Sequence, residues 1–219
     1  MTNEIKEILI YGHASGPNPW KVIMVLEELE LPYKHKLLEM SEIKQEPYIH
    51  LNPNGRVPTI EDPNTGITLW ESGAIIEYLI DTYDKERKLS IDTFPEKYHL
   101  KQFLYFQSSG QGPYYGQLAW FKAFHPEKIE SAIARYEDQA IRVVAVLDKI
   151  LQGKEYLVGN RITYADIAFV SWEVTIRKMI PDLDERAERL YPNYLAWFRR
   201  VSARPSVKRT LKLKSEAMA

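Results

Sequence analysis

The spacing of apolar residues changes partway along the chain, and this change limits the possible folds more than any other feature. Up to about residue 84, short strand-like runs alternate with two amphipathic helical runs. After the charged, turn-bearing stretch DKERKLSIDTFPEK at 84–97, the apolar runs have helical spacing. The sequence therefore predicts an α/β domain at residues 1–84 and an all-α domain at residues 94–219.

The first domain opens with a β-α-β pattern. Residues 5–13 and the run YKHKLLEM, at 33–40, read as strands, the second with one wet face. Between them, Pro19 suits the first turn of a helix with apolar residues at i, i+3, i+4 and i+7, namely Val22, Val25, Leu26 and Leu29. A right-handed crossover makes the two strands parallel.

A hairpin and a further helix follow. VPTIED and ITLWE flank the turn-rich segment DPNTG, and together they complete a mixed four-stranded sheet. Ser72 is expected to cap the next helix, whose apolar face carries Ile75, Ile76, Leu79 and Tyr83.

The second domain reads as helical throughout. A helix at 95–121 is interrupted at SGQGP, where two glycines and Pro113 weaken the backbone ladder, so a bend is expected. A long helix follows at 127–151. Thr163 and Asp166 form a capping box with a structural role, and the last clear helix stops before Pro205.

Composition excludes several functions. Lys and Arg number 29 and Asp and Glu 30, so the net charge of -1 offers no field for nucleic acid or an anionic membrane. No secretory core and no apolar run of about 18 residues is present, so we expect a cytoplasmic protein without a membrane partner.

The chain has no cysteine, so it has no disulfide, no zinc-thiolate site and no thiol nucleophile. Any sulfur chemistry must use a sulfur that the ligand brings. The histidines at positions 13, 35, 50, 99 and 125 are not spaced as paired ligands, so no metal site is expected.

The stretch NPNGRVPTIEDPNTGITLWESGAII, at 52–76, holds two features with alternative interpretations. Pro58 can be an ordinary trans proline at the start of a strand, or a cis proline that leaves the Val57 backbone free to pair with an extended peptide. Glu71 and Ser72 can be a plain helix start, or a site where helix N–H groups bind a carboxylate beside an acid that holds an ammonium. The second alternatives together suggest a peptide ligand with amino-acid termini.

Four segments in the same order resemble the cytosolic glutathione transferase family: LNPNGRVPTIED, ESGAIIEYL, YLVGNRITYADIAF and YPNYLAWFRRVSARPSVKR. The resemblance implies a thioredoxin-like N-terminal domain, an all-helical C-terminal domain, a homodimer, a role in detoxification, and glutathione as co-substrate with no other cofactor. It also implies a cis Val57–Pro58 bond, with the Val57 backbone pairing with the cysteinyl unit and Glu71 and Ser72 taking the γ-glutamyl end.

Within the family, SGPNPWKV and SGQGPYYGQLAWF resemble the fungal branches related to the nitrogen-catabolism regulator. By this resemblance Asn18 stabilises the glutathione sulfur, with Ser15 as its rival, and Tyr11 is disfavoured because it lies inside the first strand. Where relatives carry Gln or His to meet the glycyl carboxylate, this chain aligns Ile43, and Lys44 is the substitute.

An acceptor site for a hydrophobic electrophile is expected near the helix interruption, where aromatic residues gather. The alternative, that these residues pack the core, stays open. They are Tyr114, Tyr115, Trp120, Phe121 and Phe124.

The predicted function is a glutathione transferase that conjugates glutathione to hydrophobic electrophiles and reduces organic peroxides. One alternative is a ligandin that binds aromatic compounds with little turnover. A regulatory scaffold is disfavoured, because the regulator carries a long polar N-terminal extension and this sequence reaches its first strand within seven residues.

Overall fold

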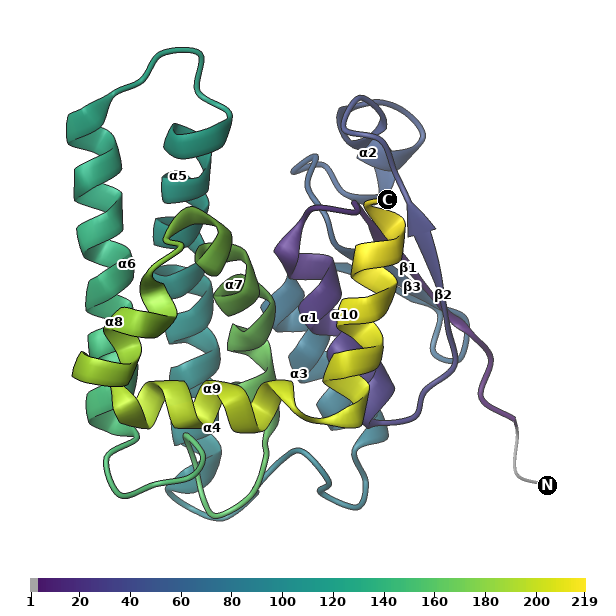
Figure 1. Cartoon of the computed structure of the whole chain (residues 1–219). Coiled ribbons are helices and arrows are strands. Elements are labelled where there is room, and N and C mark those ends of the chain that lie inside the picture. The colour runs from purple at the N-terminus through teal and green to yellow at the C-terminus, as the bar shows by residue number, and fades with distance from the viewer. Residues whose placement is uncertain (1–3) are drawn as a thin grey trace. The chain divides into compact units, whose positions relative to one another are not determined.

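The computed structural model describes residues 4–219. The chain divides into two compact units: the residues up to 89 together with 204–219, and residues 90–203. The first unit holds the sheet and the second is helical throughout (Figure 1).

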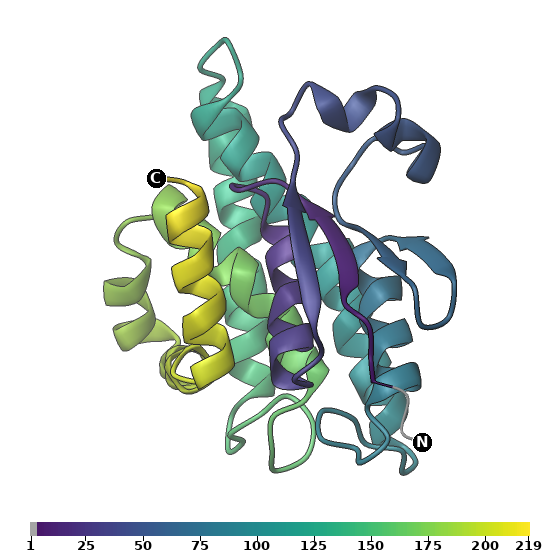
Figure 2. The same cartoon turned by 90° about the vertical axis from the view of Figure 1, so that its right-hand side faces the viewer.

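A mixed four-stranded sheet forms the centre of the first unit. Its strands are β1 (Ile8–Gly12), β2 (Tyr33–Leu37), β3 (Thr59–Asp62) and β4 (Ile67–Trp70), in the spatial order β2-β1-β3-β4. Strand β1 is parallel to β2 and antiparallel to β3, which in turn is antiparallel to β4. The predicted parallel pair and hairpin are therefore confirmed, and Figure 2 shows the twisted sheet.

Both faces of this sheet are covered. Helices α1 (Pro17–Glu28) and α3 (Ser72–Tyr83) pack together and against the strands, and the alternate residues Ile8 and Ile10 are fully buried. Leu9 and Tyr11 project the opposite way, where they join an apolar cluster beneath the 3-10 turn Glu42–Lys44 and helix α2 (Tyr48–Leu51). The period-2 alternation of β1 produces these two faces.

The C-terminal segment corrects the sequence reading. The helix before Pro205 stops at Ser202 as predicted, but Pro205 then begins a further helix that was not expected, α10 (Pro205–Ala217), in which proline occupies the first turn. Residues 204–219 belong to the first unit, whereas the sequence assigned them to the helical domain. The reason is packing on α1 (Figure 1): Val207 is fully buried, and Arg204 donates hydrogen bonds to Glu28 of α1 at 2.6 and 2.8 Å.

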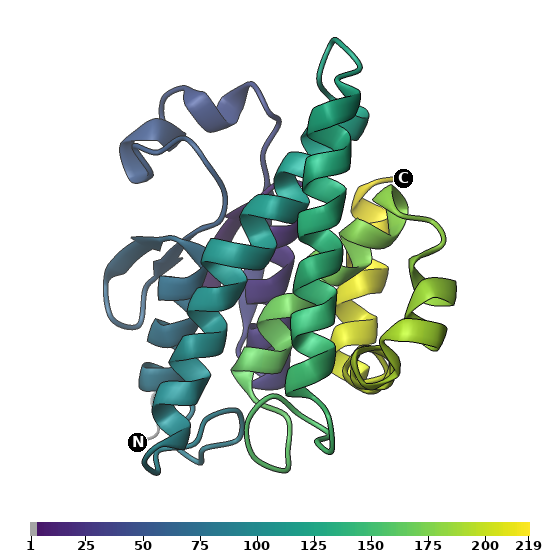
Figure 3. The ribbon, with the colours of Figure 1, turned by 90° about the vertical axis from the view of Figure 1, so that its left-hand side faces the viewer.

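The second unit is a set of packed helices. They are α4 (Glu96–Phe106), α5 (Gly112–Ala123), α6 (Glu130–Ile150), α7 (Tyr164–Met179), α8 (Leu183–Leu190) and α9 (Pro192–Ser202). A π-helical turn, Gln107–Gln111, separates α4 from α5, so the predicted interruption is confirmed. Figure 3 shows α5 and α6 side by side.

The predicted capping box begins α7. Asp166 is fully buried, and its carboxylate accepts hydrogen bonds from the Thr163 backbone N–H at 3.0 Å and from the Thr163 hydroxyl at 2.8 Å. It also accepts hydrogen bonds from the Leu157 N–H and from Trp197 Nε1, both at 2.9 Å. Asp166 thus joins the start of α7 to α9 and to the loop before it.

Across residues 4–219, no helix combines the length and the apolar character needed to cross a lipid bilayer.

Candidate functional site

Helix α1 starts at Pro17 and has Pro19 in its first turn, as predicted, so Asn18 is its second residue. The side chain of Asn18 is partly buried. The first backbone N–H groups of a helix have no intrahelical acceptor, and the helix dipole adds positive potential there. Asn18 therefore lies at the positive end of α1, where a thiolate would be stabilised.

Ser15 lies in the loop before α1 and contacts the ring of His13. The backbone N–H of Ser15 donates to His13 Nδ1 at 3.3 Å, and Ser15 Oγ lies 3.0 Å from the same atom. A backbone N–H can only donate, so Nδ1 carries a lone pair and the neutral ring holds its proton on Nε2. The Ser15 hydroxyl therefore donates to His13.

The same loop lies beside the start of β3. A Cβ built on Gly16 would meet Val57 Cγ2 at 3.8 Å. The Val57–Pro58 peptide bond is cis, Val57 is partly buried and Pro58 is buried. The Ser15 loop and Val57 are thus neighbours within the first unit.

A hydrogen-bonded loop holds Val57 in place. Asn52 is buried, and its Nδ2 donates to the carbonyl oxygen of Arg56 at 2.7 Å, which the Tyr48 hydroxyl also contacts at 2.6 Å. Gly55 turns the chain with a φ of 59°, a conformation that glycine adopts without strain. The asparagine and glycine of NPNGRVP therefore fix the residue that precedes Val57.

Glu71 and Ser72 occupy the start of α3, with one correction to the predicted cap. The N-cap residue is Glu71, and Ser72 is the first helical residue. Glu71 is exposed and has a φ of 70°, which is uncommon for a residue other than glycine and is typical of functional sites. Its carbonyl oxygen accepts the Ile75 N–H at 2.9 Å, so the N–H groups of residues 72–74 precede the helical ladder.

Lys21 lies one turn after Asn18 on α1 and is 1 % exposed. Burial lowers the pKa of Lys21 to about 7, and attraction to the Glu71 carboxylate partly opposes that shift. The buried Lys21 amine of α1 thus interacts electrostatically with Glu71 at the start of α3.

Two further predicted residues differ in exposure. Ile43 is buried in the cluster beneath α2, so its side chain faces the core. Lys44 is exposed on the same 3-10 turn, and its Cγ lies 3.4 Å from a Cβ built on Gly55. Lys44 is therefore placed beside the loop that leads to Val57.

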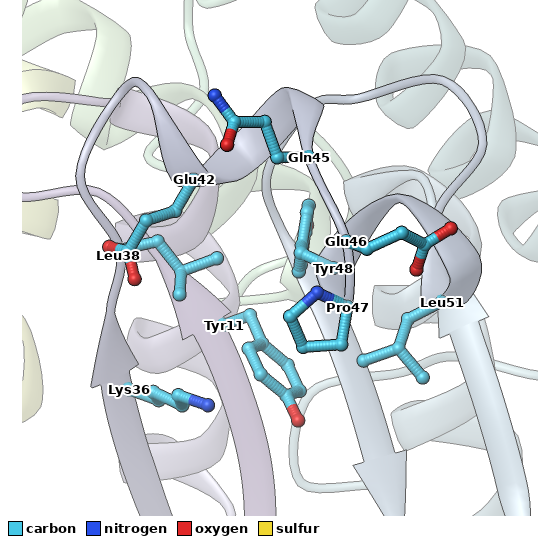
Figure 4. A pocket seen from close by; sticks show the side chains of 9 residues that line it. All are labelled: Tyr11, Lys36, Leu38, Glu42, Gln45, Glu46, Pro47, Tyr48 and Leu51. Carbon is cyan, nitrogen blue, oxygen red and sulfur yellow. The ribbon is translucent and has the colours of Figure 1, made fainter.

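Tyr11 belongs to a separate pocket of about 120 Å³ on the α2 side of the sheet (Figure 4). Its hydroxyl donates to Glu61 Oε2 at 2.5 Å, and Lys36 Nζ lies 5.2 Å from its ring centre. Burial and the bond to Glu61 raise the pKa of Tyr11 to about 12. The pocket contains none of the predicted glutathione residues; its lining is Tyr11, Lys36, Leu38, Glu42, Gln45, Glu46, Pro47, Tyr48 and Leu51.

The predicted acceptor residues lie on α5 and just after it, in the second unit. Trp120 and Phe124 are 47 % and 66 % exposed and stack with ring centres 6.3 Å apart. Phe121 stacks on Tyr136, and Arg142 lies over the Tyr114 ring. Tyr115 differs, because it is fully buried and its hydroxyl donates to Glu173 at 3.1 Å, so it packs in the helical core.

Sequence reasoning missed His13, Lys21 and Asn52. The Asn52–Gly55 spacing is a turn signal that could have identified the loop role of Asn52. For Lys21 no local signal exists, since its burial depends on packing. Among residues 4–219, no group of three or more His, Asp or Glu side chains is arranged to hold a metal ion.

Comparison with known proteins gives this arrangement a family. Residues 15–82 match the glutathione S-transferase N-terminal domain, and residues 113–205 match the glutathione S-transferase C-terminal domain. The chain therefore belongs to the glutathione S-transferase family, a class of enzymes, and the thioredoxin-like fold predicted for its first part is confirmed.

Fungal proteins are among its relatives. The chain is 43 % identical to glutathione S-transferase-like protein gedE of Aspergillus terreus, over 95 % of this chain and 96 % of that protein. It is also 43 % identical to glutathione S-transferase 1 of Schizosaccharomyces pombe, over 97 % and 98 %.

Solved structures from the Ure2-type branch are similar over the whole chain. Glutathione transferase URE2P8 of Phanerochaete chrysosporium, crystallised with oxidized glutathione, has a TM-score of 0.92 and 39 % identity, covering 99 % of both chains. Ure2p5 of the same fungus, cocrystallized with 1-(S-glutathionyl)-2,4-dinitrobenzene, has a TM-score of 0.88 and 36 % identity, covering 99 % of this chain and 98 % of that one. The predicted resemblance to the regulator-related fungal branch is confirmed.

Proposed function

We propose that this protein is a glutathione transferase that conjugates the glutathione thiolate to hydrophobic, electrophilic small molecules. The observation that carries the proposal is the grouping of Asn18, Val57, Glu71 and Ser72 on the first unit, at two helix starts and one strand start. The glutathione complexes of similar fungal proteins support it.

Each residue has a chemical role. The Val57 backbone pairs with the cysteinyl unit of glutathione in the manner of an added strand. The N–H groups at the start of α3, with the Ser72 hydroxyl, bind the γ-glutamyl carboxylate, and the Glu71 carboxylate binds the neighbouring ammonium. The Lys44 ammonium is exposed and meets the glycyl carboxylate.

Thiolate formation is the step that these contacts must favour. A free thiol with a pKa near ~8.5 is a few per cent thiolate at neutral pH, and the thiolate is the nucleophile. A hydrogen bond from Asn18 Nδ2 to a charged sulfur contributes about 1.5–3 kcal/mol, or roughly one to two pK units. The positive end of α1 adds a few tenths to ~1 kcal/mol, which makes the thiolate a major species.

The aromatic side chains of α5 provide the acceptor site in this proposal. Trp120 and Phe124 supply exposed, stacked rings, and Tyr114 and Phe121 extend the aromatic surface. The aryl conjugate bound to Ure2p5 supports an aromatic acceptor. Tyr115 does not face this surface; its hydrogen bond to Glu173 helps to hold α5 in place.

The first test is calorimetric titration with glutathione, together with the ultraviolet absorbance of the bound thiolate. Binding with thiolate formation near neutral pH, followed by turnover of 1-chloro-2,4-dinitrobenzene or another electrophile, supports the transferase. Binding without thiolate indicates the ligandin alternative, and the absence of binding contradicts both.

The acceptor site has its own test. Trp120→Ala should raise the KM for an aromatic electrophile several-fold while the affinity for glutathione stays the same. Tyr98→Ala is the matched control, because Tyr98 is also an exposed aromatic residue paired with a second ring, Phe94, at 6.2 Å. An unchanged KM in Trp120→Ala would remove α5 from the acceptor site.

The proposal includes a cytoplasmic homodimer that reduces organic peroxides as a second reaction of the same thiolate. Peroxide reduction needs the same activated sulfur, so it should fall in parallel with conjugation in Asn18→Ala. Sedimentation equilibrium at several protein concentrations tests the dimer, and a monomer at all of them would exclude it.

A further inference from the structure

The loop between β1 and α1 contains a serine and a histidine in direct contact. Ser15 Oγ and His13 Nδ1 are 3.0 Å apart, and the Ser15 backbone N–H, 3.3 Å from Nδ1, fixes that nitrogen as an acceptor. A second backbone bond, from the Gly16 N–H to the His13 carbonyl at 3.2 Å, closes the turn. The hydroxyl therefore donates its proton to the ring.

This loop lies next to the place assigned to the cysteinyl unit. Gly16 follows Ser15 and lies against Val57, and Asn18 lies three residues after Ser15. The Asn18 amide can donate a hydrogen bond to a thiolate, but it is not a base and cannot accept the thiol proton. The proton must therefore pass to water or to a nearby base, and the Ser15–His13 pair belongs to the loop that lies against Val57.

We propose that Ser15 and His13 form a proton relay that deprotonates bound glutathione, an inference that rests on the proposed function. The S–H bond breaks and its proton passes to Ser15 Oγ as the Ser15 hydroxyl proton passes to His13 Nδ1. The products are a thiolate and an imidazolium, and the Ser15 backbone N–H gives up its contact with Nδ1, which no longer accepts once it is protonated. His13 Nδ1–H then donates to Ser15 Oγ, so the Ser15 hydroxyl turns to donate to the thiolate. His13 acts through Ser15 and does not touch the sulfur.

The other basic groups around the loop differ from His13 in their environment. His35 of β2 lies behind Gly12, and burial lowers its pKa to about 4, so it stays neutral. Lys21 of α1 is buried, and its pKa is lowered to about 7 by burial against the attraction of Glu71. An imidazole ordinarily titrates about two units below a thiol, so transfer needs the thiolate stabilisation that Asn18 and the helix start supply.

A proton inventory tests the relay. At neutral pH, thiolate formed on glutathione binding is measured by ultraviolet absorbance, and protons released to the solvent are counted by calorimetry in two buffers of different ionisation enthalpy. With the relay, released protons are fewer than thiolates formed, and complete transfer releases none. S-methylglutathione, which has no thiol proton, measures proton changes at all other groups, Lys21 included, and is subtracted.

Variants assign the stored proton. His13→Asn keeps an acceptor for Ser15 without a titratable ring, so released protons should equal thiolates formed, and thiolate should decrease. Ser15→Ala should also release as many protons as it forms thiolates. Ser15→Thr, which keeps the hydroxyl, should again release fewer protons than it forms thiolates. His99→Asn, an exposed histidine on α4, is the matched control and should behave as the original protein.

Nuclear magnetic resonance provides a second readout, since the His13 ring protons should move to imidazolium positions with glutathione and not with S-methylglutathione. If the original protein binds glutathione as thiolate with equal proton release, or if His13→Asn keeps the difference, the relay is overturned while the transferase stands. If no thiolate forms at all, the proposed function fails first.

Discussion

Asn52 Nδ2 lies 2.7 Å from the carbonyl oxygen of Arg56, and this contact holds the residue before Val57. Asn52→Ala leaves a buried carbonyl with fewer donors, so we expect the free energy of unfolding to fall by about 1–3 kcal/mol. Glutathione should also bind more weakly, because Val57 loses its fixed position. Urea unfolding and calorimetry measure the two effects.

Asn54→Ala is the control, since that side chain is exposed and its backbone N–H, which donates to Asn52 Oδ1 at 3.0 Å, is kept. Wild-type affinity in a folded Asn52→Ala protein would contradict the assignment of Val57 to the ligand.

Arg204→Met tests the attachment of α10. Glu28 is 4 % exposed, so loss of its partner should lower the free energy of unfolding by about 2–3 kcal/mol, a value reduced because Arg204 is 31 % exposed. Arg199→Met, which removes a pair with both side chains more than half exposed, should change it by less than about 1 kcal/mol. Equal effects of the two variants would refute a special role for Glu28.

The same pair predicts an acid dependence. Burial alone would raise the pKa of Glu28, but hydrogen bonds from Arg204 and Ser206 outweigh it and the pKa lies below its ordinary value. A lowered carboxyl pKa stabilises the fold above about pH 4.3 and loses that contribution as the pH falls through the folded-state value. The free energy of unfolding should therefore change less between about pH 6 and a pH below about 4 in Arg204→Met than in the original protein.

Asp166→Ala should destabilise the helical unit strongly. The buried carboxylate accepts four hydrogen bonds from Leu157, Thr163 and Trp197, and all four donors would lose their acceptor. We expect a loss of about 3–5 kcal/mol, measured by urea unfolding followed through tryptophan fluorescence. Thr163→Ser keeps the hydroxyl and should cost far less; a mild effect of Asp166→Ala would disprove the central role of this carboxylate.

Lys21 predicts a dependence of stability on alkaline pH. Burial lowers the pKa of Lys21 to about 7 in the folded protein, whereas an unfolded lysine titrates near ~10.4. Between these values the unfolded chain binds the extra proton, so the free energy of unfolding should rise with pH. Urea unfolding from about pH 7 to about pH 9 should show the rise, and Lys21→Met should reduce it.

Lys34→Met, at an exposed lysine of β2, is the matched control and should keep the slope. A slope that persists in Lys21→Met would assign it to another group.

Local sequence patterns predicted much of the fold because they reflect interactions between residues that are close in the sequence. The turn between Asp62 and Gly66, the alternation of β1 and the Thr163–Asp166 box depend on residues close in sequence. Pro205 shows the limit of such reasoning, because a proline that ends one helix also suits the first turn of the next, and the sequence does not say which applies.

The candidate site was predicted in part. Motif resemblance supplied Asn18, Val57, Glu71 and Ser72, but the Ser72 cap was assigned one residue too late, since the backbone at Glu71 takes a φ of 70°. Tyr115 and Trp120 share a helix and an aromatic character, yet one is buried and the other exposed. Helical spacing fixes the angle between the two side chains around the helix axis, but it does not say which face of the helix packs against the core.

The sequence by itself determined the order of strands and main helices in the first domain, the helical character of the second, the turn residues of the 52–58 loop and the absence of a cysteine thiol. The tertiary structure alone decided that α10 returns to the first unit through Glu28, that Lys21 is buried near Glu71, and that Asn52 holds Arg56. The physical reason is that propensity and periodicity act over a few residues, whereas burial, desolvation and ion pairing depend on which distant segments pack together.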